Sequence, residues 1–180
     1  SAIRLARRLE KYDPLWFEEP VPPDNRKEMA RVASSTTIPI SGGERLVSRF
    51  EFNDLLQQQA VQILQPALGR VGGIFEGKKI AAMAEAHYAQ FAPHLYAGPI
   101  EAAANIQLSA SLPNFLILES IETFEGFSNQ LLTKPIRWED GYVVVPDEPG
   151  LGFELNEAFC DANPYTSDTV FPPMAKRPLG

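Results

Sequence analysis

Short apolar runs alternate with longer amphipathic stretches along the first two thirds of the sequence. The short runs are hydrophobic at consecutive positions, which is typical of strands that are buried on both faces. The longer stretches have apolar residues at helical spacing. The pattern predicts strands at 15–17, 38–40, 60–65, 90–93 and 115–118, and helices at 1–11, 25–34, 50–59, 74–88 and 100–111. Regular alternation of the two predicts parallel β/α units.

The predicted strands end at a regular interval. The residues at these ends are Glu18, Glu44, Ala67, His94 and Glu119, which are 26, 23, 27 and 25 positions apart. A (β/α)8 barrel and a doubly wound open sheet both have such a period. Polar side chains at nearly every strand end favour the barrel, whose active sites draw residues from several strand ends at one face. No GxGxxG motif follows a predicted strand, which argues against a dinucleotide-binding sheet.

The pattern changes near residue 124. Two short runs, at 136–138 and 142–145, are separated by a turn sequence and predict a hairpin. The last segment is rich in proline and predicts an irregular tail. We therefore expect the chain to consist of three parts, at 1–131, 132–159 and 160–180.

Two glutamates stand at the ends of the first two predicted strands. Glu18 precedes a Glu-Pro break, and Glu44 follows two glycines. Neighbouring strands of a barrel would bring the two carboxylates together, where they repel unless a cation or a proton lies between them. Mg²⁺ is a hard ion that prefers oxygen ligands, so it is the natural candidate. The alternative is that both glutamates are solvated acids in loops.

Two further residues at strand ends could contribute to the same site. His94 ends the fourth predicted strand, where its imidazole could act as general acid or base near neutral pH. The alternative is a structural histidine in a loop. Glu119 ends the fifth predicted strand and could face the same pocket or remain a solvated acid. His87 lies on a predicted helix and is interpreted as a surface or packing residue.

Charge and composition narrow the possible partners and compartment. The chain has 16 Lys and Arg against 23 Asp and Glu, a net charge of −7, which argues against a nucleic-acid partner. It has no apolar run of the roughly 18 residues that a membrane span needs. The single cysteine, Cys160, excludes an internal disulfide framework and predicts a reducing, cytoplasmic compartment.

Six motifs add a family resemblance to this interpretation. They are Trp-Phe-Glu-Glu-Pro at 16–20, Gly-Gly-Glu-Arg-Leu at 42–46, Gln-Pro-Ala-Leu-Gly-Arg-Val-Gly-Gly-Ile at 65–74, Ala-Pro-His at 92–94, Leu-Glu-Ser at 118–120 and Asp-Gly-Tyr-Val-Val-Val-Pro-Asp-Glu-Pro-Gly-Leu-Gly at 140–152. In this order and spacing they resemble the enolase superfamily, in particular the acid-sugar dehydratases of its mandelate racemase subgroup. The resemblance implies strands four to eight of a partial TIM-type barrel. A C-terminal segment that packs toward a capping domain would follow, and the full-length protein would be a homo-oligomer.

The resemblance also implies a role for each candidate residue. Glu18 and Glu44 would be two of three carboxylate ligands of Mg²⁺, and the third would be an aspartate upstream of Ser1. His94 would be the general acid or base, and Glu119 would hydrogen-bond the substrate carboxylate. The reaction would be removal of the proton α to a carboxylate, with stabilisation of an enediolate. Dehydration of an acid sugar or another small anionic 2-hydroxy carboxylate is the expected outcome.

Two features of the 65–67 strand end distinguish this chain from other members of the superfamily. Ala67 stands where the subgroup usually has an aspartate bonded to the histidine, and the lysine of the muconate-lactonizing subgroup is absent. A racemase, epimerase or cycloisomerase of the same superfamily is an alternative, as is a truncated or degenerate fragment without catalysis. Part of a barrel is expected to expose strand edges and apolar faces, and so to aggregate or to associate with another chain that closes the barrel.

Overall fold

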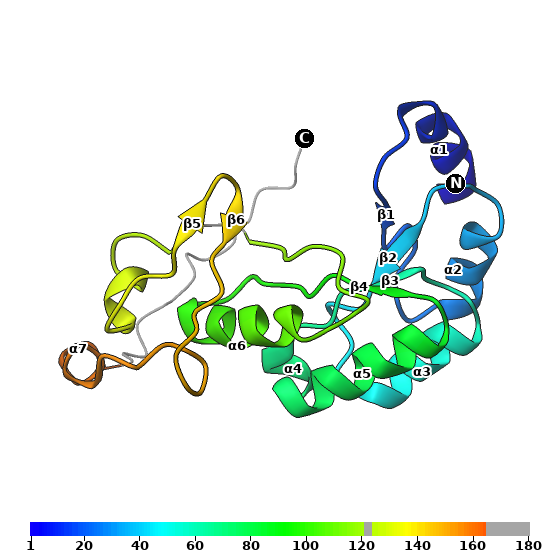
Figure 1. Cartoon of the computed structure of the whole chain (residues 1–180). Coiled ribbons are helices and arrows are strands. Elements are labelled where there is room, and N and C mark those ends of the chain that lie inside the picture. The colour runs from blue at the N-terminus through cyan, green and yellow to red at the C-terminus, as the bar shows by residue number, and fades with distance from the viewer. Residues whose placement is uncertain (121–123, 165–180) are drawn as a thin grey trace, which may run out of the picture.

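The computed structural model describes residues 1–120 and 124–164. Its centre is a sheet of four parallel strands, β1 (Phe17–Glu18), β2 (Ile40–Gly42), β3 (Ile63–Leu64) and β4 (Gln90–Phe91), in the order β1-β2-β3-β4 (Figure 1). In this sheet Phe17 pairs with Ile40, Ser41 with Ile63, and Ile63 with Gln90. Strands that are neighbours in the sequence are also neighbours in the sheet, which confirms the predicted β/α units.

The third and fourth strands are shorter than the apolar runs that predict them. Pro66 and Pro93 follow β3 and β4 closely, and proline has no N–H to donate to a ladder. Pairing resumes beyond the prolines in a single parallel bridge between Ala67 and His94. The prolines therefore interrupt the ladder between β3 and β4, and beyond them the two segments, as far as the structure describes the chain, are paired only at this bridge.

The fifth predicted strand, at 115–118, is reduced to one bridge. Phe115 forms a parallel bridge with Phe91. The Phe91 N–H donates to the Asn114 carbonyl, and the Leu116 N–H donates to the Phe91 carbonyl, both at 2.9 Å. The prediction of a full strand is therefore wrong, although the segment lies beside β4 where the β/α order predicts it. The apolar residues of this segment predict that it is buried. A regular strand also needs further backbone hydrogen bonds to its neighbour, and among the described residues this segment forms only those to Phe91 given above.

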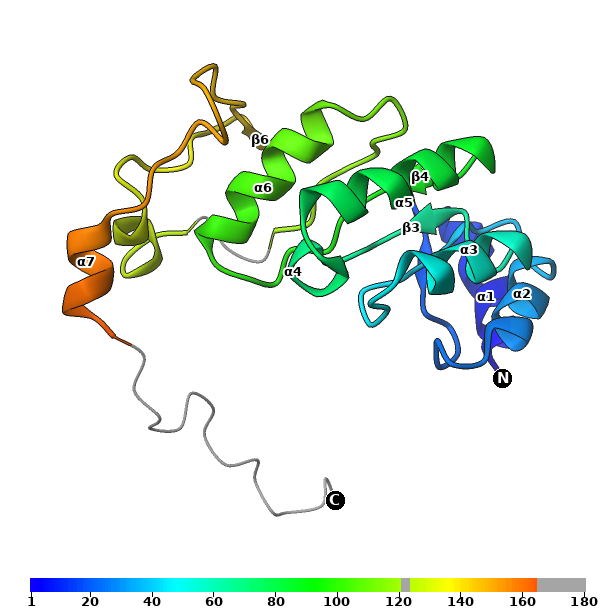
Figure 2. The same cartoon turned by 90° about the horizontal axis from the view of Figure 1, so that it is seen from below.

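The helices that connect the strands form a single layer. α1 (Ala2–Leu9), α2 (Arg26–Ala33), α3 (Arg49–Gln57), α5 (Ile74–Ala86) and α6 (Pro99–Ala110) correspond to the five predicted helices. α1 packs on α2, α3 on α5, and α5 on α6. Figure 1 shows α3, α5 and α6 together below the strands, and Figure 2 views the molecule from that side. A doubly wound sheet would have helices on both faces, so the arrangement is that of a partial barrel.

Local sequence explains where these helices begin. At the start of α2 the Asn25 side chain accepts a hydrogen bond from the Glu28 N–H at 3.2 Å. Ser48 and Glu51 form a capping box at the start of α3, and Pro99 occupies the first turn of α6. Each device satisfies or removes an N–H that a helix start leaves unpaired.

The main core lies between the sheet and this helix layer. Phe52 of α3 and Ile80 of α5 are fully buried there, together with Ile40, Leu64 and Phe91 from the strands. Burial of side chains of this size stabilises the fold by about 1.5–3 kcal/mol each. The core therefore holds the strands rigidly, and with them the residues at their carboxyl ends.

The segment after residue 124 contains the predicted hairpin, with β5 (Trp138–Glu139) antiparallel to β6 (Tyr142–Val143). Leu132 and Ile136 pack with Leu95 and Ile106 in a second, smaller core, which ties this segment to α6. The remaining elements are η1 (Glu10–Tyr12), α4 (Leu68–Val71), η2 (Ser128–Leu131) and α7 (Glu157–Ala162). In the described ranges, no helix has the length and apolarity that crossing a membrane requires.

The helix α7 extends past residue 160, where the sequence predicts that an irregular tail begins. Asn156 accepts a hydrogen bond from the Phe159 N–H at 3.2 Å and so caps the start of this helix. Residues 165–180 of the predicted tail lie outside the described residues.

Candidate functional site

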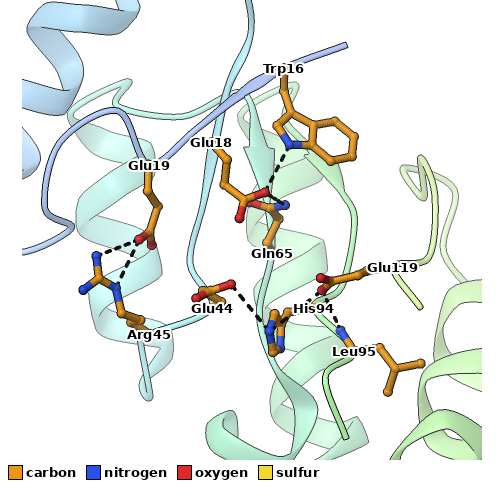
Figure 3. A network of polar contacts seen from close by, with 9 residues as sticks. All are labelled: Trp16, Glu18, Glu19, Glu44, Arg45, Gln65, His94, Leu95 and Glu119. Atoms are coloured by element: carbon orange, nitrogen blue, oxygen red, sulfur yellow. Dashed lines mark hydrogen bonds and ion pairs between the residues drawn. The ribbon is translucent and has the colours of Figure 1, made fainter. Parts of the chain in front are cut away.

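Four polar side chains lie at the carboxyl ends of the parallel strands. Glu18 is the last residue of β1, Glu44 follows β2, His94 follows β4, and Glu119 follows the segment 115–118. Figure 3 shows the four side chains in one close-up, in which His94 lies between Glu44 and Glu119 while Glu18 contacts Trp16 and Gln65. The carboxyl ends of parallel strands in a barrel lie at one face, where such enzymes have their active sites. The structure therefore brings the four residues predicted from the sequence to the same edge.

His94 lies between two of the carboxylates. Its Nε2 is 3.5 Å from Glu44 Oε2 and 3.9 Å from Glu119 Oε2. The His94 side chain is 14% exposed, and those of Glu44 and Glu119 are 36% and 42% exposed. Glu119 Oε2 also accepts the Leu95 N–H at 2.9 Å. An ionisable ring thus lies between two partly exposed carboxylates, an arrangement suited to proton transfer.

Glu18 has a separate set of partners. Its Oε2 accepts hydrogen bonds from Trp16 Nε1 at 3.1 Å and from Gln65 Nε2 at 2.8 Å. Gln65 is 7% exposed, and its Oε1 has no hydrogen-bond partner in the described part of the chain. Sequence reasoning misses both partners. The available signal was Gln65 itself, a polar residue at the end of the predicted strand 60–65.

The donor chemistry of Glu18 and Glu44 suits a magnesium ion. The strands that carry them, β1 and β2, are adjacent in the sheet. Mg²⁺ usually keeps several waters and takes one or two protein carboxylates, so a pair of glutamates is a suitable set. Across residues 1–120 and 124–164, no group of three or more His, Cys, Asp or Glu side chains is arranged to hold a metal.

Comparison with known proteins assigns a family to this arrangement. Residues 1–159 match the family model described as enolase C-terminal domain-like. The chain belongs to the enolase superfamily. The resemblance inferred from the sequence motifs is confirmed, as is a fold equivalent to the C-terminal portion of such enzymes.

Two curated relatives and one solved structure show how similar this enolase superfamily chain is to known proteins. D-xylonate dehydratase of Haloferax volcanii is 39% identical over 171 residues, which cover 95% of this chain and 42% of the relative. D-galactonate dehydratase of Variovorax paradoxus is 41% identical over 159 residues, which cover 85% of this chain and 42% of that relative. A mandelate racemase/muconate lactonizing enzyme from Sulfitobacter sp., known from its crystal structure, is 52% identical in sequence, and its structure matches with a TM-score of 0.87. The match covers 98% of this chain and 44% of that protein. The chain thus spans about two fifths of the length of its curated relatives.

Proposed function

We propose that this chain is part of a Mg²⁺-dependent enzyme that dehydrates acid sugars. The observation that carries the proposal is the position of His94 Nε2 at the carboxyl edge of the sheet, 3.5 Å from Glu44 and 3.9 Å from Glu119. The D-xylonate and D-galactonate dehydratases, at 39% and 41% identity, support it. The substrate class is a small carboxylate with hydroxyl groups on its α and β carbons.

Glu18 and Glu44 would hold the metal ion. When bound, Mg²⁺ would withdraw electron density from the substrate carboxylate and so make the α proton easier to remove. The hydrogen bonds from Trp16 and Gln65 hold the Glu18 carboxylate in one orientation. Outer partners of this kind typically orient a metal ligand and raise metal affinity.

His94 would be the acid that completes the elimination. The α proton passes to neutral His94 Nε2 as the α C–H bond breaks, the electron pair of that bond forms a double bond between the α and β carbons, and the β C–O bond breaks. A proton from His94 Nε2 joins the departing hydroxyl, which leaves as water. The remaining enol rearranges to a 2-keto acid with a methylene group at its β carbon.

Glu119 would position the substrate beside His94. Its Oε2 is held by the Leu95 N–H at 2.9 Å, which fixes the carboxyl group next to the imidazole. In its protonated form Glu119 would donate a hydrogen bond to the substrate carboxylate. A displacement of about 1 Å in a bound substrate can cost about 100-fold in rate, so this contact would affect turnover as well as binding.

A chimaera tests the proposed activity. Residues 1–159 would replace the matching segment of the V. paradoxus D-galactonate dehydratase, which supplies the rest of the fold. D-galactonate and D-xylonate would be assayed for 2-keto acid in the presence of Mg²⁺. We expect turnover that falls by about 10²–10⁴-fold in His94→Asn. His87→Asn is the matched control because His87 is exposed at the end of α5, outside the network of Figure 3.

Three outcomes would contradict the proposal, provided that circular dichroism shows a folded chimaera. Lack of turnover with both acids would contradict the substrate class. Activity that survives His94→Asn would contradict the role of the histidine. Exchange of the α proton with solvent deuterium without loss of water would favour a racemase or epimerase.

A further inference from the structure

The acid that follows Glu18 forms a constrained ion pair beside the candidate metal site. Glu19 Oε2 accepts hydrogen bonds from Arg45 Nε at 3.1 Å and from Arg45 Nη2 at 2.8 Å (Figure 3). The Glu19 side chain is 12% exposed, and its Oε1 is buried without a hydrogen-bond partner among the described residues. Hydrogen bonding to Glu19, and then its charge, raise the pKa of Arg45. Because Glu19 and Arg45 directly follow Glu18 and Glu44, the pair joins the ends of β1 and β2.

The backbone at Glu19 is held in an unfavourable conformation. Its φ is +34°, a region that side chains rarely adopt, and the next residue is Pro20. Its N–H donates to the Ser41 carbonyl at 3.0 Å. A Cβ at Gly42 would lie 3.3 Å from Glu19 Cγ, so glycine at this position leaves room for the glutamate side chain. Strained residues persist where the surroundings hold them firmly, and they cluster at functional sites.

We propose that the Glu19–Arg45 pair is a clamp that sets the spacing between the Glu18 and Glu44 carboxylates. The proposal rests on the proposed function, because it takes these two carboxylates as Mg²⁺ ligands. Without the clamp, the turns after β1 and β2 keep the backbone bond from Glu19 to Ser41 but lose their side-chain link. The two carboxylates then spend more time apart. Groups that orient metal ligands contribute about 10–100-fold to metal affinity.

A purely electrostatic role for Arg45 makes the opposite prediction. A guanidinium near two metal-binding carboxylates repels Mg²⁺, so its removal should tighten binding if charge were its sole contribution. A positioning role predicts weaker binding. The sign of the change in Arg45→Met therefore separates the two roles. Glu19→Gln tests whether the two residues act together. The variant that combines Glu19→Gln with Arg45→Met should bind Mg²⁺ no more weakly than either single variant, because each single change already opens the clamp.

The test is a Mg²⁺ titration of the 180-residue chain, followed by NMR of the backbone amides of Glu18 and Glu44. This measurement reaches the weak affinities expected for a site with two protein ligands. We expect Arg45→Met and Glu19→Gln each to raise the Kd for Mg²⁺ by about 10-fold or more. Arg45→Lys keeps the charge but not the two-pronged contact, so its Kd should lie between those of the wild type and Arg45→Met. Thermal melts monitored by circular dichroism establish that each variant folds.

Arg31→Met is the matched control, since Arg31 forms an exposed pair with Glu28 on α2, and its Kd should equal that of the wild type. Tighter or unchanged binding in Arg45→Met would overturn the clamp while leaving the metal site intact. If Arg45→Met fails to fold, an unchanged Kd in Arg45→Lys overturns the clamp instead. A wild-type chain whose Glu18 and Glu44 amides do not respond to Mg²⁺ would overturn the proposed metal site, and the clamp with it.

Discussion

The backbone of Ala67 pairs with that of His94 in a parallel bridge, and the buried Nδ1 of His94 has no hydrogen-bond partner in the part of the chain that the structure describes. Ala67 is 4% exposed and offers the imidazole a methyl group alone. A hydrogen bond at one ring nitrogen normally fixes the tautomer and orientation of a histidine. The orientation of His94 therefore depends on packing and on the acids near its Nε2, Glu44 and Glu119.

Replacing Ala67 with aspartate should supply the missing partner. The new carboxylate would lie beside His94 because the two positions are paired, and it would accept the Nδ1–H. We expect Ala67→Asp to raise the turnover of the chimaera by up to about 10-fold. It should also lower the free energy of unfolding by about 1–3 kcal/mol or more, because a polar group is buried. Steady-state assays and urea denaturation measure the two effects.

Ala67→Asn is the control for charge, since it adds a similar acceptor without a carboxylate. It should recover part of the gain in turnover and lower the free energy of unfolding less than Ala67→Asp does. Turnover that falls in a folded Ala67→Asp chimaera would show that His94 is already held in its working orientation without a partner at Nδ1.

The order of elements and the four candidate residues could be predicted because both depend on local pattern. Continuous apolar runs mark buried strands, and the repeat of these runs places Glu18, Glu44, His94 and Glu119 directly after them. Parallel β/α units then bring the strand ends to one edge. Asn156 is a capping residue that could indicate the start of α7, but the prediction places it in the segment 132–159, before a Pro-rich tail that begins at residue 160.

The contacts around these residues could not be predicted from the sequence. The Gln65–Glu18 bond joins positions 47 apart, and the Glu19–Arg45 bonds join positions 26 apart. Which way each side chain points depends on irregular backbone at the strand ends. The positive φ of Glu19 is an example, because an L residue before proline is expected to be extended.

Gly43 should be intolerant of a side chain. Its φ is +129°, and a Cβ there would lie 2.5 Å from Cε1 of the fully buried Phe52. Gly43→Ala therefore combines backbone strain with a clash in the core, and we expect it to lower the free energy of unfolding by about 2–4 kcal/mol. In Gly98→Ala a Cβ would meet no atom within 4 Å at an ordinary φ of −77°. That control should change stability by less than about 0.5 kcal/mol. Equal denaturation midpoints for Gly43→Ala and the wild type would contradict the prediction.

Glu76 should make stability depend on pH in the acid range. A hydrogen bond from Lys79, and then those from Arg49 at 2.8 and 2.9 Å, lower the pKa of Glu76 in the folded chain. A carboxyl group with a depressed folded pKa contributes stability above its unfolded pKa of about 4.3, and the contribution disappears as the pH falls through the folded pKa. Glu76→Gln should therefore be less stable than the wild type near neutral pH and equally stable in strong acid.

Urea denaturation at a series of pH values measures this difference for Glu76→Gln. Glu85→Gln removes the same charge from an exposed position on the same helix and is the control. A Glu76→Gln deficit that stays constant from neutral pH to below about pH 3 would show that Glu76 stabilises the fold through packing and not through its charge.

The described sheet has open edges next to apolar surface. β1 is paired on one side, with β2, and the segment 115–118 is paired on one side, with β4. Ile117, Tyr142 and Val145 are 46%, 76% and 43% exposed, and they line a groove between that segment, α6 and the hairpin. Unpaired strand edges beside exposed apolar residues favour association with another chain.

We therefore expect the chain to form dimers or larger species whose proportion rises with concentration, as measured by size-exclusion chromatography with light scattering. Lysine on an edge opposes strand pairing through charge and solvation, so Ile117→Lys combined with Tyr142→Lys should shift the chain toward monomer. Tyr88→Lys is the control, because Tyr88 is 98% exposed but lies outside this groove. A wild-type chain that remains monomeric at every concentration would contradict the prediction, and so would an equal shift in the Tyr88→Lys control.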